Sequence, residues 1–293
     1  MPAIKRILIT GGTGQLGQSF KRIVDDFSEY DFILPERAEL DLYSEKSIDA
    51  FFKQHQCDLI INCAAYTAVD KAESDPELAN QINHIAVLKL AQIAQKHSMK
   101  LIHISTDYVF DGRQHRPYVE TDKVAPQSVY GDTKLKGEQS LLQVMRQNAI
   151  VIRTSWVYSE FGNNFVKTML KLGRGRDNVT VIFDQIGAPT YAGDLAQAVM
   201  HIVQHHEFSL LNFESQIYHY SNEGVCSWYD FANTIFELST ITCDVKPIEA
   251  KDYATPAVRP QYSVLNKAKI KQHYELTIPY WKDPLKECLT LLE

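Results

Sequence analysis

The chain has 293 residues, of which 45% are apolar and 23% charged, as in an ordinary folded protein. At roughly 150 residues per domain, this length predicts one large or two modest domains. The net charge is −6 with no basic stripe, which excludes non-specific nucleic-acid binding. No apolar run approaches the about 20 residues of a membrane span. Five scattered cysteines without a C-x-x-C pair favour free thiols, so we expect a cytoplasmic protein.

The first half of the chain alternates short apolar runs with longer helical patterns. Strands are predicted at residues 5–10, 31–34, 58–62, 100–104 and 149–153, and helices at 15–27, 44–55, 76–97 and 128–147. Strands that are apolar throughout indicate a parallel sheet with helices on both faces. The predicted fold class is therefore α/β, a Rossmann-type doubly wound parallel sheet.

After about residue 155 the alternation becomes irregular. Helices are predicted at 164–172, 194–206, 227–238 and 281–292, strands at 179–183 and 217–220, and a loop at 253–262. We expect a dinucleotide-binding domain over residues 1–155, to which about 178–206 return, and a smaller, mainly substrate-binding domain over 156–293. Ligands of open parallel sheets lie beyond the carboxyl ends of the strands, here in the cleft between the two parts.

A glycine-rich turn follows the first predicted strand and opens the first helix. Residues 11–17 read GGTGQLG, a spacing variant of the dinucleotide-binding fingerprint. Gly11 permits a tight turn, Gly14 lets the backbone approach a pyrophosphate, and Gly17 lets the helix lie close to the sheet. The pyrophosphate would bind at the helix N-terminus. The strand-turn-helix context predicts a dinucleotide site.

Two residues at the end of the second predicted strand bear on the choice between NADH and NADPH, and they leave it open. Glu36 stands where an acid would bind the ribose 2′-hydroxyl of NAD. Arg37 follows it and would instead pair with the 2′-phosphate of NADP. The two residues point to opposite answers, so use of both cofactors is a fair hypothesis.

Tyr130 and Lys134 form a Y-x-x-x-K pair on one face of a predicted helix. A lysine ammonium favours the phenolate, so we expect it to lower the tyrosine pKa and make Tyr130 an acid for a carbonyl oxygen. About one such spacing arises by chance in this composition, so the context decides. Thr106 closes the fourth strand, where it would bond the same oxygen, and small residues end the third strand. This order resembles the extended short-chain dehydrogenase/reductases.

Longer segments resemble one family in particular. They are residues 64–73 (AAYTAVDKAE), 105–112 (STDYVFDG), 129–134 (VYGDTK), 153–158 (RTSWVY), 162–169 (GNNFVKTM), 184–190 (DQIGAPT) and 256–260 (PAVRP). Together they are similar to the dTDP-4-dehydrorhamnose reductase family over nearly the whole chain. The resemblance implies NAD(P)H-dependent reduction of the 4-keto group of dTDP-4-dehydro-β-L-rhamnose, the last step of dTDP-L-rhamnose biosynthesis for cell-surface polysaccharides.

The resemblance also implies roles for individual residues. Tyr130 would supply the proton, Lys134 would hold the nicotinamide ribose, and Thr106 would orient the keto oxygen. The cofactor would be lined by Gly14, Gln15, Leu16, Asp41, Leu42, Ala64, Ala65 and Tyr66. The substrate would contact Thr106, Asp107, Trp156, Asn164 and Arg259, the last through its diphosphate.

One departure concerns the oligomer. Some family members dimerise through a divalent cation held by glutamates, but residues 17–20 (GQSF) and 191–194 (YAGD) carry no glutamate at the corresponding places. We therefore expect no metal, and a homodimer stays open. Two other functions also stay open: an epimerase or dehydratase acting on another nucleotide sugar, and a non-catalytic regulatory subunit.

Overall fold

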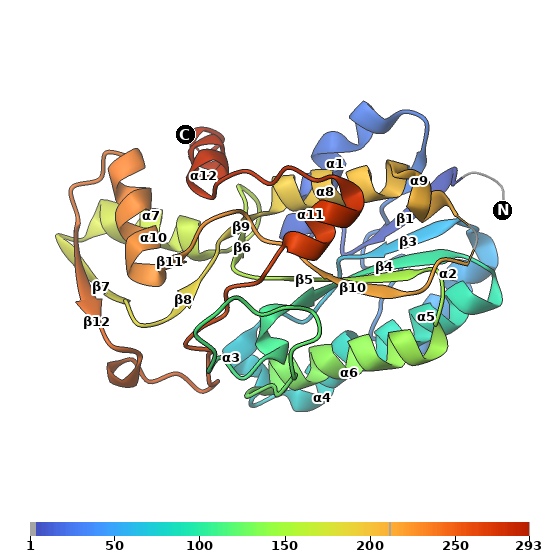
Figure 1. The fold of residues 1–293 in the computed structure, drawn as a ribbon, viewed down its shortest axis with the longest axis horizontal. Helices are drawn as coiled ribbons and strands as arrows, with labels where there is room; N and C mark the ends of the chain where they lie inside the picture. The colour runs from blue at the N-terminus through green and yellow to red at the C-terminus, as the bar shows by residue number, and fades with distance from the viewer. Residues whose placement is uncertain (1–3, 211, 293) are drawn as a thin grey trace.

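The computed structural model describes residues 4–210 and 212–292. A six-stranded sheet runs in the order β10-β5-β4-β3-β1-β2, and all neighbouring strands are parallel. The strands are β1 (Arg6–Thr10), β2 (Asp31–Ile33), β3 (Leu59–Asn62), β4 (Lys100–Thr106), β5 (Ala149–Thr154) and β10 (Gln216–His219). The predicted parallel sheet is confirmed, and its edge strand β10 comes from the second half of the chain (Figure 1).

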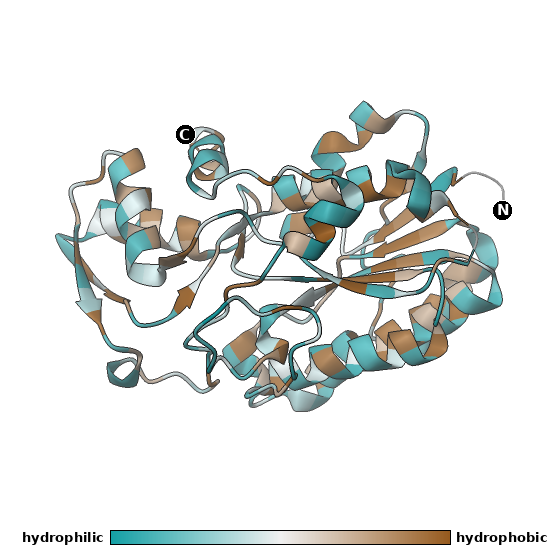
Figure 2. Cartoon of the chain, viewed as in Figure 1, coloured by the Kyte–Doolittle hydropathy of each residue, from teal (hydrophilic) through white to brown (hydrophobic). Residues whose placement is uncertain are grey.

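Helices cover both faces of this sheet because successive strand side chains point to opposite sides. Ile7 and Ile9 belong to a core shared with α1 (Gln15–Ile23), α8 (Ala192–Gln204) and α11 (Ala268–Tyr274). Leu8 belongs to the opposite core, with α2 (Glu45–Gln54), α5 (Ala86–Lys96) and α6 (Val129–Val144). The hydropathy colours show these buried strands as mostly brown (Figure 2). Ser44 caps α2 as predicted, accepting from the Ser47 backbone nitrogen.

A separate core lies beside the sheet. It is built from α7 (Phe165–Gly175), β7 (Asn178–Ile182), α10 (Trp228–Leu238), β12 (Asp244–Ile248) and α12 (Lys282–Thr290). We expected the segment of β7 to return to the dinucleotide-binding part, but it pairs with β12 outside the large sheet. The physical reason is its alternating burial, with one face exposed, whereas a central parallel strand is buried on both. Only α8, later in that segment, packs on the sheet.

Several short elements complete the fold. They are α3 (Val69–Ala72), α4 (Pro76–Asn80), β6 (Val157–Tyr158), β8 (Ile186–Gly187), β9 (Thr190–Tyr191), α9 (His206–Ser209) and β11 (Cys226–Ser227). The helix predicted over 76–97 is α4 and α5 joined by a π-helical segment, Gln81–Ile85. Inside it, the Asn83 side chain accepts from the Tyr66 backbone nitrogen at 2.8 Å and donates to the Tyr66 carbonyl oxygen at 3.1 Å. Within the described residues no helix is both long and apolar enough to cross a membrane.

Candidate active site

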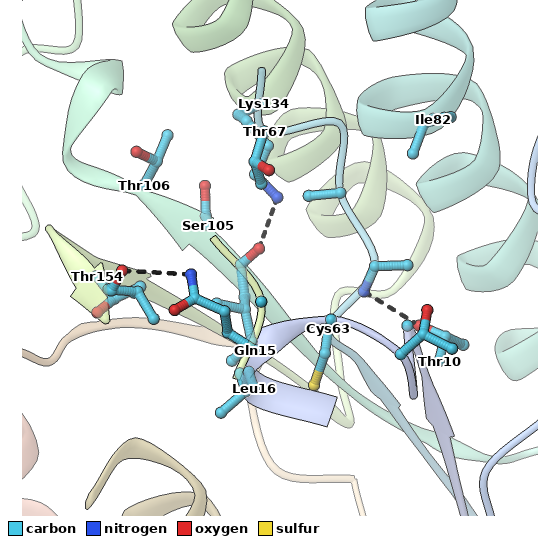
Figure 3. A pocket seen from close by; sticks show the side chains of 18 of the residues that line it. Thr10, Gln15, Leu16, Cys63, Thr67, Ile82, Ser105, Thr106, Lys134 and Thr154 are labelled. Carbon is cyan, nitrogen blue, oxygen red and sulfur yellow. Dashed lines mark hydrogen bonds between the residues drawn. The ribbon is translucent and has the colours of Figure 1, made fainter. Parts of the chain in front are cut away.

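A cavity of about 720 Å³ opens at the carboxyl ends of β1, β3, β4 and β5. β2 lies on one side of β1, and β3 and the later strands lie on the other, so the strand order changes direction between β1 and β3. Open parallel sheets bind ligands at this position. Thr10 and Cys63 lie on one side of the cavity, and Thr106 lies on the other (Figure 3). Trp156 and Trp228 contribute to its wall from beyond the sheet.

The glycine turn has the geometry that the sequence predicts. Gly11 has a φ of +71°, and a Cβ there would lie 2.8 Å from the Ala64 backbone nitrogen. A Cβ on Gly17 would lie 2.2 Å from the Gly11 carbonyl oxygen, so α1 could not start so close to the turn. Gly14 caps α1 without a side chain, which leaves the helix N-terminus to the cavity. These residues fit a bound pyrophosphate.

Most of the predicted cofactor-binding residues line this cavity. They are Gly11, Gly14, Gln15, Leu16, Arg37, Asp41, Leu42, Ala64, Ala65, Tyr130 and Lys134. Gly17, Glu36 and Tyr66 do not line it. Gly17 lies against the backbone of the turn, and Glu36 is exposed with its backbone nitrogen bonded to the Glu39 carboxylate. The backbone of Tyr66 is held by Asn83 instead.

Arg37 is the charged residue of the Glu36–Arg37 pair that reaches the cavity. Its Nε lies 3.5 Å from Asp41 Oδ1, and its side chain is 76% exposed. The guanidinium therefore has room to turn toward an anion, whereas Glu36 lies off the cavity wall. This placement favours binding of a 2′-phosphate over recognition of a bare ribose hydroxyl.

Replacing Arg37 with alanine is therefore expected to weaken the binding of NADPH more than the binding of NADH. A hydrogen bond to a charged group contributes roughly 1.5–3 kcal/mol, so KM for NADPH should rise about tenfold or more while KM for NADH changes little. Steady-state kinetics with both cofactors measure this. Equal changes for both would contradict it. For the unaltered protein, a kcat/KM ratio above about a hundredfold either way would exclude dual use.

Tyr130, Lys134 and Thr106 converge on the cavity, the first two from α6 and the third from the end of β4. Ser128 caps α6 by accepting from the Gly131 backbone nitrogen at 3.2 Å, so the helix begins just before Tyr130. The buried Lys134 Nζ donates to the Ile104 carbonyl oxygen at 2.6 Å (Figure 3). The Thr106 hydroxyl donates to Asp107 Oδ1 at 3.0 Å.

The expected lowering of the Tyr130 pKa by Lys134 is wrong for this structure. Burial raises the pKa of Tyr130 to about 12; a hydrogen bond with Thr106 lowers it in part, and the nearby Asp107 raises it. Lys134 is not among the groups that shift the pKa of Tyr130, and its amine bonds Ile104 and His103. Burial also lowers the pKa of Lys134 to about 8. Tyr130 therefore carries its proton at neutral pH and can donate it.

Two further polar groups of the cavity wall lie at strand ends. The buried Ser105 Oγ has no hydrogen-bond partner in the described part of the chain, which leaves it available to a ligand. Asp107 is also buried, and burial raises its carboxyl pKa to about 6 while hydrogen bonds from Ser263 and Thr106 lower it in part. A ligand group that donates a hydrogen bond would find an acceptor there.

Trp156 and Asn164, for which a substrate contact is predicted, both line the cavity. Trp156 has a φ of +49° and stacks on Trp228, with ring centroids 3.5 Å apart and planes at 8°. Gly187 makes room, since a Cβ there would lie 2.5 Å from the Trp156 ring. Asn164 also has a structural role, since it accepts from the Lys167 backbone nitrogen and donates to Gln15 Oε1 at 2.9 Å.

Arg259 does not line the cavity. Its guanidinium forms two hydrogen bonds with Asp70, at 3.0 and 2.6 Å. The same carboxylate accepts from the Ala257 backbone nitrogen at 3.2 Å, which ties the 253–262 loop to α3. Contact between Arg259 and a ligand would require this pair to open.

Sequence reasoning missed several residues of the cavity wall. They include Tyr43, Thr154, Val157, Gly162, Asn163 and Trp228. Trp228 lies inside the Ser227–Asp230 capping box at the start of α10. This signal predicts the helix start but not what the indole faces. The stack with Trp156 depends on chain segments far apart in sequence.

The parallel sheet, the glycine turn and the Tyr130–Lys134–Thr106 arrangement define an NAD(P)H-dependent oxidoreductase of the extended short-chain dehydrogenase/reductase type. The family model described as "RmlD substrate binding domain" matches residues 5–293. The dTDP-4-dehydrorhamnose reductase of Aggregatibacter actinomycetemcomitans is 40% identical over 96% of this chain and 97% of its own. The chain therefore belongs to the dTDP-4-dehydrorhamnose reductase family.

Two solved structures agree with this membership. A dTDP-4-dehydrorhamnose reductase from Clostridium acetobutylicum superposes with a TM-score of 0.91 at 39% identity, covering 98% of this chain and 99% of its own. The reductase from Bacillus anthracis, solved in complex with NADP, gives 0.91 at 35% identity with the same coverage.

Proposed function

We propose that this protein reduces the 4-keto group of dTDP-4-dehydro-β-L-rhamnose with NAD(P)H, giving dTDP-L-rhamnose. The observation that carries the proposal is the convergence of Tyr130, Lys134 and Thr106 on one cavity beside the glycine turn. The names of its relatives support the particular substrate. When bound, NAD(P)H supplies the hydride that is transferred to the sugar carbonyl carbon.

The chain's own residues then manage binding and the proton. The Tyr130 hydroxyl gives its proton to the oxygen that becomes the new sugar hydroxyl. Thr106 turns its hydroxyl from Asp107 Oδ1 to donate a hydrogen bond to the same oxygen, which holds that oxygen beside Tyr130. Lys134 binds the nicotinamide ribose through its ammonium group. The pKa of Tyr130 supports this order of events, because burial keeps the phenol protonated until the oxygen becomes basic.

For the substrate we propose contacts from three wall residues and one residue of the loop. Trp156 would pack against the sugar, and Asp107 and Asn164 would accept from or donate to its hydroxyls. Arg259 would leave Asp70 to bind the diphosphate, since a guanidinium matches phosphate oxygens. We also propose that 156–293 forms most of the substrate-binding domain, and that the reaction takes place in the cytoplasm, where reduced dinucleotides are available.

The proposal is tested by following NADPH and NADH absorbance at 340 nm with the 4-keto sugar made in situ from dTDP-glucose. Stoichiometric oxidation with dTDP-L-rhamnose as product is expected. An epimerase would regenerate its cofactor, so product formation without net oxidation would favour that reading. Cofactor binding without any turnover of the sugar would favour another sugar substrate first and a regulatory role second.

Activity is expected to survive excess EDTA. In the described residues no group of three or more His, Cys, Asp or Glu side chains is placed to hold a metal ion. The physical reason is that the steps above use only side-chain hydrogen bonds and a bound dinucleotide. Initial rates and light scattering before and after chelation measure activity and oligomeric state together. Loss of either that magnesium restores would contradict the expectation; a homodimer without metal remains a proposal.

A further inference from the structure

Three buried polar side chains lie side by side on neighbouring strands of the large sheet. Thr10, Asn62 and His103 are at most 1% exposed and belong to β1, β3 and β4. The register pairs Thr10 with Asn62 and Asn62 with His103, so all three stand in one row across the sheet. Burying polar groups is costly unless they bond each other. The three polar side chains therefore indicate a function that apolar side chains at these positions could not perform.

The row is a continuous hydrogen-bond chain that ends on Lys134. Thr10 Oγ1 lies 2.6 Å from Asn62 Oδ1, and Asn62 Nδ2 lies 3.0 Å from His103 Nδ1. His103 Nε2 lies 3.3 Å from Lys134 Nζ. His103 is not part of the cavity wall, whereas Lys134 is. Both ends of the hydrogen-bond chain, Thr10 and Lys134, therefore lie at the cavity, and Lys134 is the end that carries a titratable group.

Each member of this chain can reverse its role. A hydroxyl, a carboxamide and a neutral imidazole all both donate and accept, while an ammonium only donates. If Lys134 is an amine, His103 Nε2–H donates to it, Asn62 donates to Nδ1, and Thr10 donates to Asn62. If Lys134 is an ammonium, it donates to Nε2 and His103 carries its proton on Nδ1. The Asn62 carboxamide then turns over, so that its Oδ1 accepts from His103 Nδ1–H and its Nδ2 donates to Thr10 Oγ1. Apolar or charged residues could not satisfy both states.

We propose that Thr10, Asn62 and His103 form a reversible hydrogen-bond chain that positions Lys134 in both of its protonation states. The inference rests on the proposed function, in which Lys134 binds the nicotinamide ribose. Both states are accessible near neutral pH, because burial lowers the pKa of Lys134 to about 8 and Glu138 and Cys63 oppose that shift. Burial and Lys134 hold the pKa of His103 well below its usual range, so the imidazole stays neutral.

Three substitutions separate positioning from packing. In His103→Gln the amide takes the place of Nε2 and keeps the contact with Lys134, whereas in His103→Asn it takes the place of Nδ1 and loses that contact. His103→Leu fills the space without a polar group. We expect His103→Gln to keep the NADPH dissociation constant within about threefold, and the other two to raise it about tenfold or more. The high-pH limb of kcat should move to lower pH in those two alone.

His219 provides the matched control. It is equally buried on β10 of the same sheet, and its Nδ1 bonds the Tyr118 carbonyl oxygen away from the cavity. His219→Gln and His219→Leu should lower the melting temperature while leaving NADPH binding and the pH profile unchanged. If the three His103 variants weaken NADPH binding equally, or if the NADPH dissociation constant changes in proportion to the melting temperature, His103 is only structural and the proposal fails.

Nitrogen-15 shifts of histidine-labelled protein give a readout that needs no sugar. The His103 signals, assigned by their loss in His103→Gln, should report the Nε2–H tautomer at high pH and the Nδ1–H tautomer at low pH, changing near pH 8. One tautomer throughout would overturn the proposal. If NADPH binds but the sugar is not reduced, the proposed function fails while the binding and tautomer measurements still decide this inference.

Discussion

Replacing Tyr130 with phenylalanine is expected to lower kcat by roughly 10²–10⁴-fold, the usual contribution of a positioned general acid. The change removes one oxygen from a half-buried ring that packs edge-on against Tyr108, so the cavity wall keeps its shape. Thr106 can still hydrogen-bond the sugar oxygen but has no acidic proton to give. KM for the sugar should change much less than kcat, because the phenol acts mainly in the transition state. Steady-state kinetics measure both.

Tyr118 offers a control for this experiment. It is fully buried outside the cavity, and its hydroxyl donates to Asp111 Oδ1 at 2.8 Å. Tyr118→Phe should cost some stability and leave kcat within about twofold, while Tyr130→Phe should bind NADPH normally. If Tyr130→Phe keeps more than about a tenth of the activity, Tyr130 is not the proton donor.

Replacing Glu138 with alanine is expected to lower the free energy of unfolding by about 3–5 kcal/mol, the usual cost of breaking a buried ion pair. Glu138 on α6 accepts from Arg153 Nε at 3.0 Å and Nη2 at 2.7 Å, and the two side chains are 1% and 3% exposed. The substitution would leave a guanidinium buried beside the Phe110 ring without its counter-charge. Urea unfolding, monitored by tryptophan fluorescence, measures the change.

An exposed pair on the same helix provides the comparison. Lys136 and Asp132 lie 2.7 Å apart and are each about half exposed. Lys136→Ala should cost less than about 1 kcal/mol, because water screens surface pairs. The double substitution Glu138→Leu with Arg153→Met should recover much of the stability lost in Glu138→Ala. Similar costs for Glu138→Ala and Lys136→Ala would show that the buried pair has no special weight.

The sheet and the glycine turn were predictable because they depend on local patterns. The segments 5–10 and 58–62 contain the short apolar runs 7–9 and 59–61, which are typical of a buried parallel strand, and the glycines of 11–17 lie between a strand and a helix. Tyr130 and Lys134 were predictable for the same reason, since helical spacing places them on one face. Their surroundings were not. The pKa of Tyr130 depends on burial that neither residue's sequence neighbours reveal.

Long-range pairings account for what the sequence could not predict. Asp70 and Arg259 are 189 residues apart, and nothing local to Arg259 shows that its partner is a carboxylate of this chain. β12 pairs with β7 across more than 60 residues, and its Pro247 reads as a turn signal rather than a strand. The residues of the π-helical segment read like those of the α-helices around it, and the bonds of Asn83 with the Tyr66 backbone join residues 17 positions apart.

The most direct test of the account is the fate of the hydride. NADPH carrying deuterium at the transferable C4 position would be incubated with the enzyme and the 4-keto sugar, and the product analysed by mass spectrometry and proton NMR. The account predicts dTDP-L-rhamnose with one deuterium, at C4 of the sugar, and no product from Tyr130→Phe on the same timescale. Product without deuterium, or deuterium at another carbon, would contradict reduction of the 4-keto group at this site.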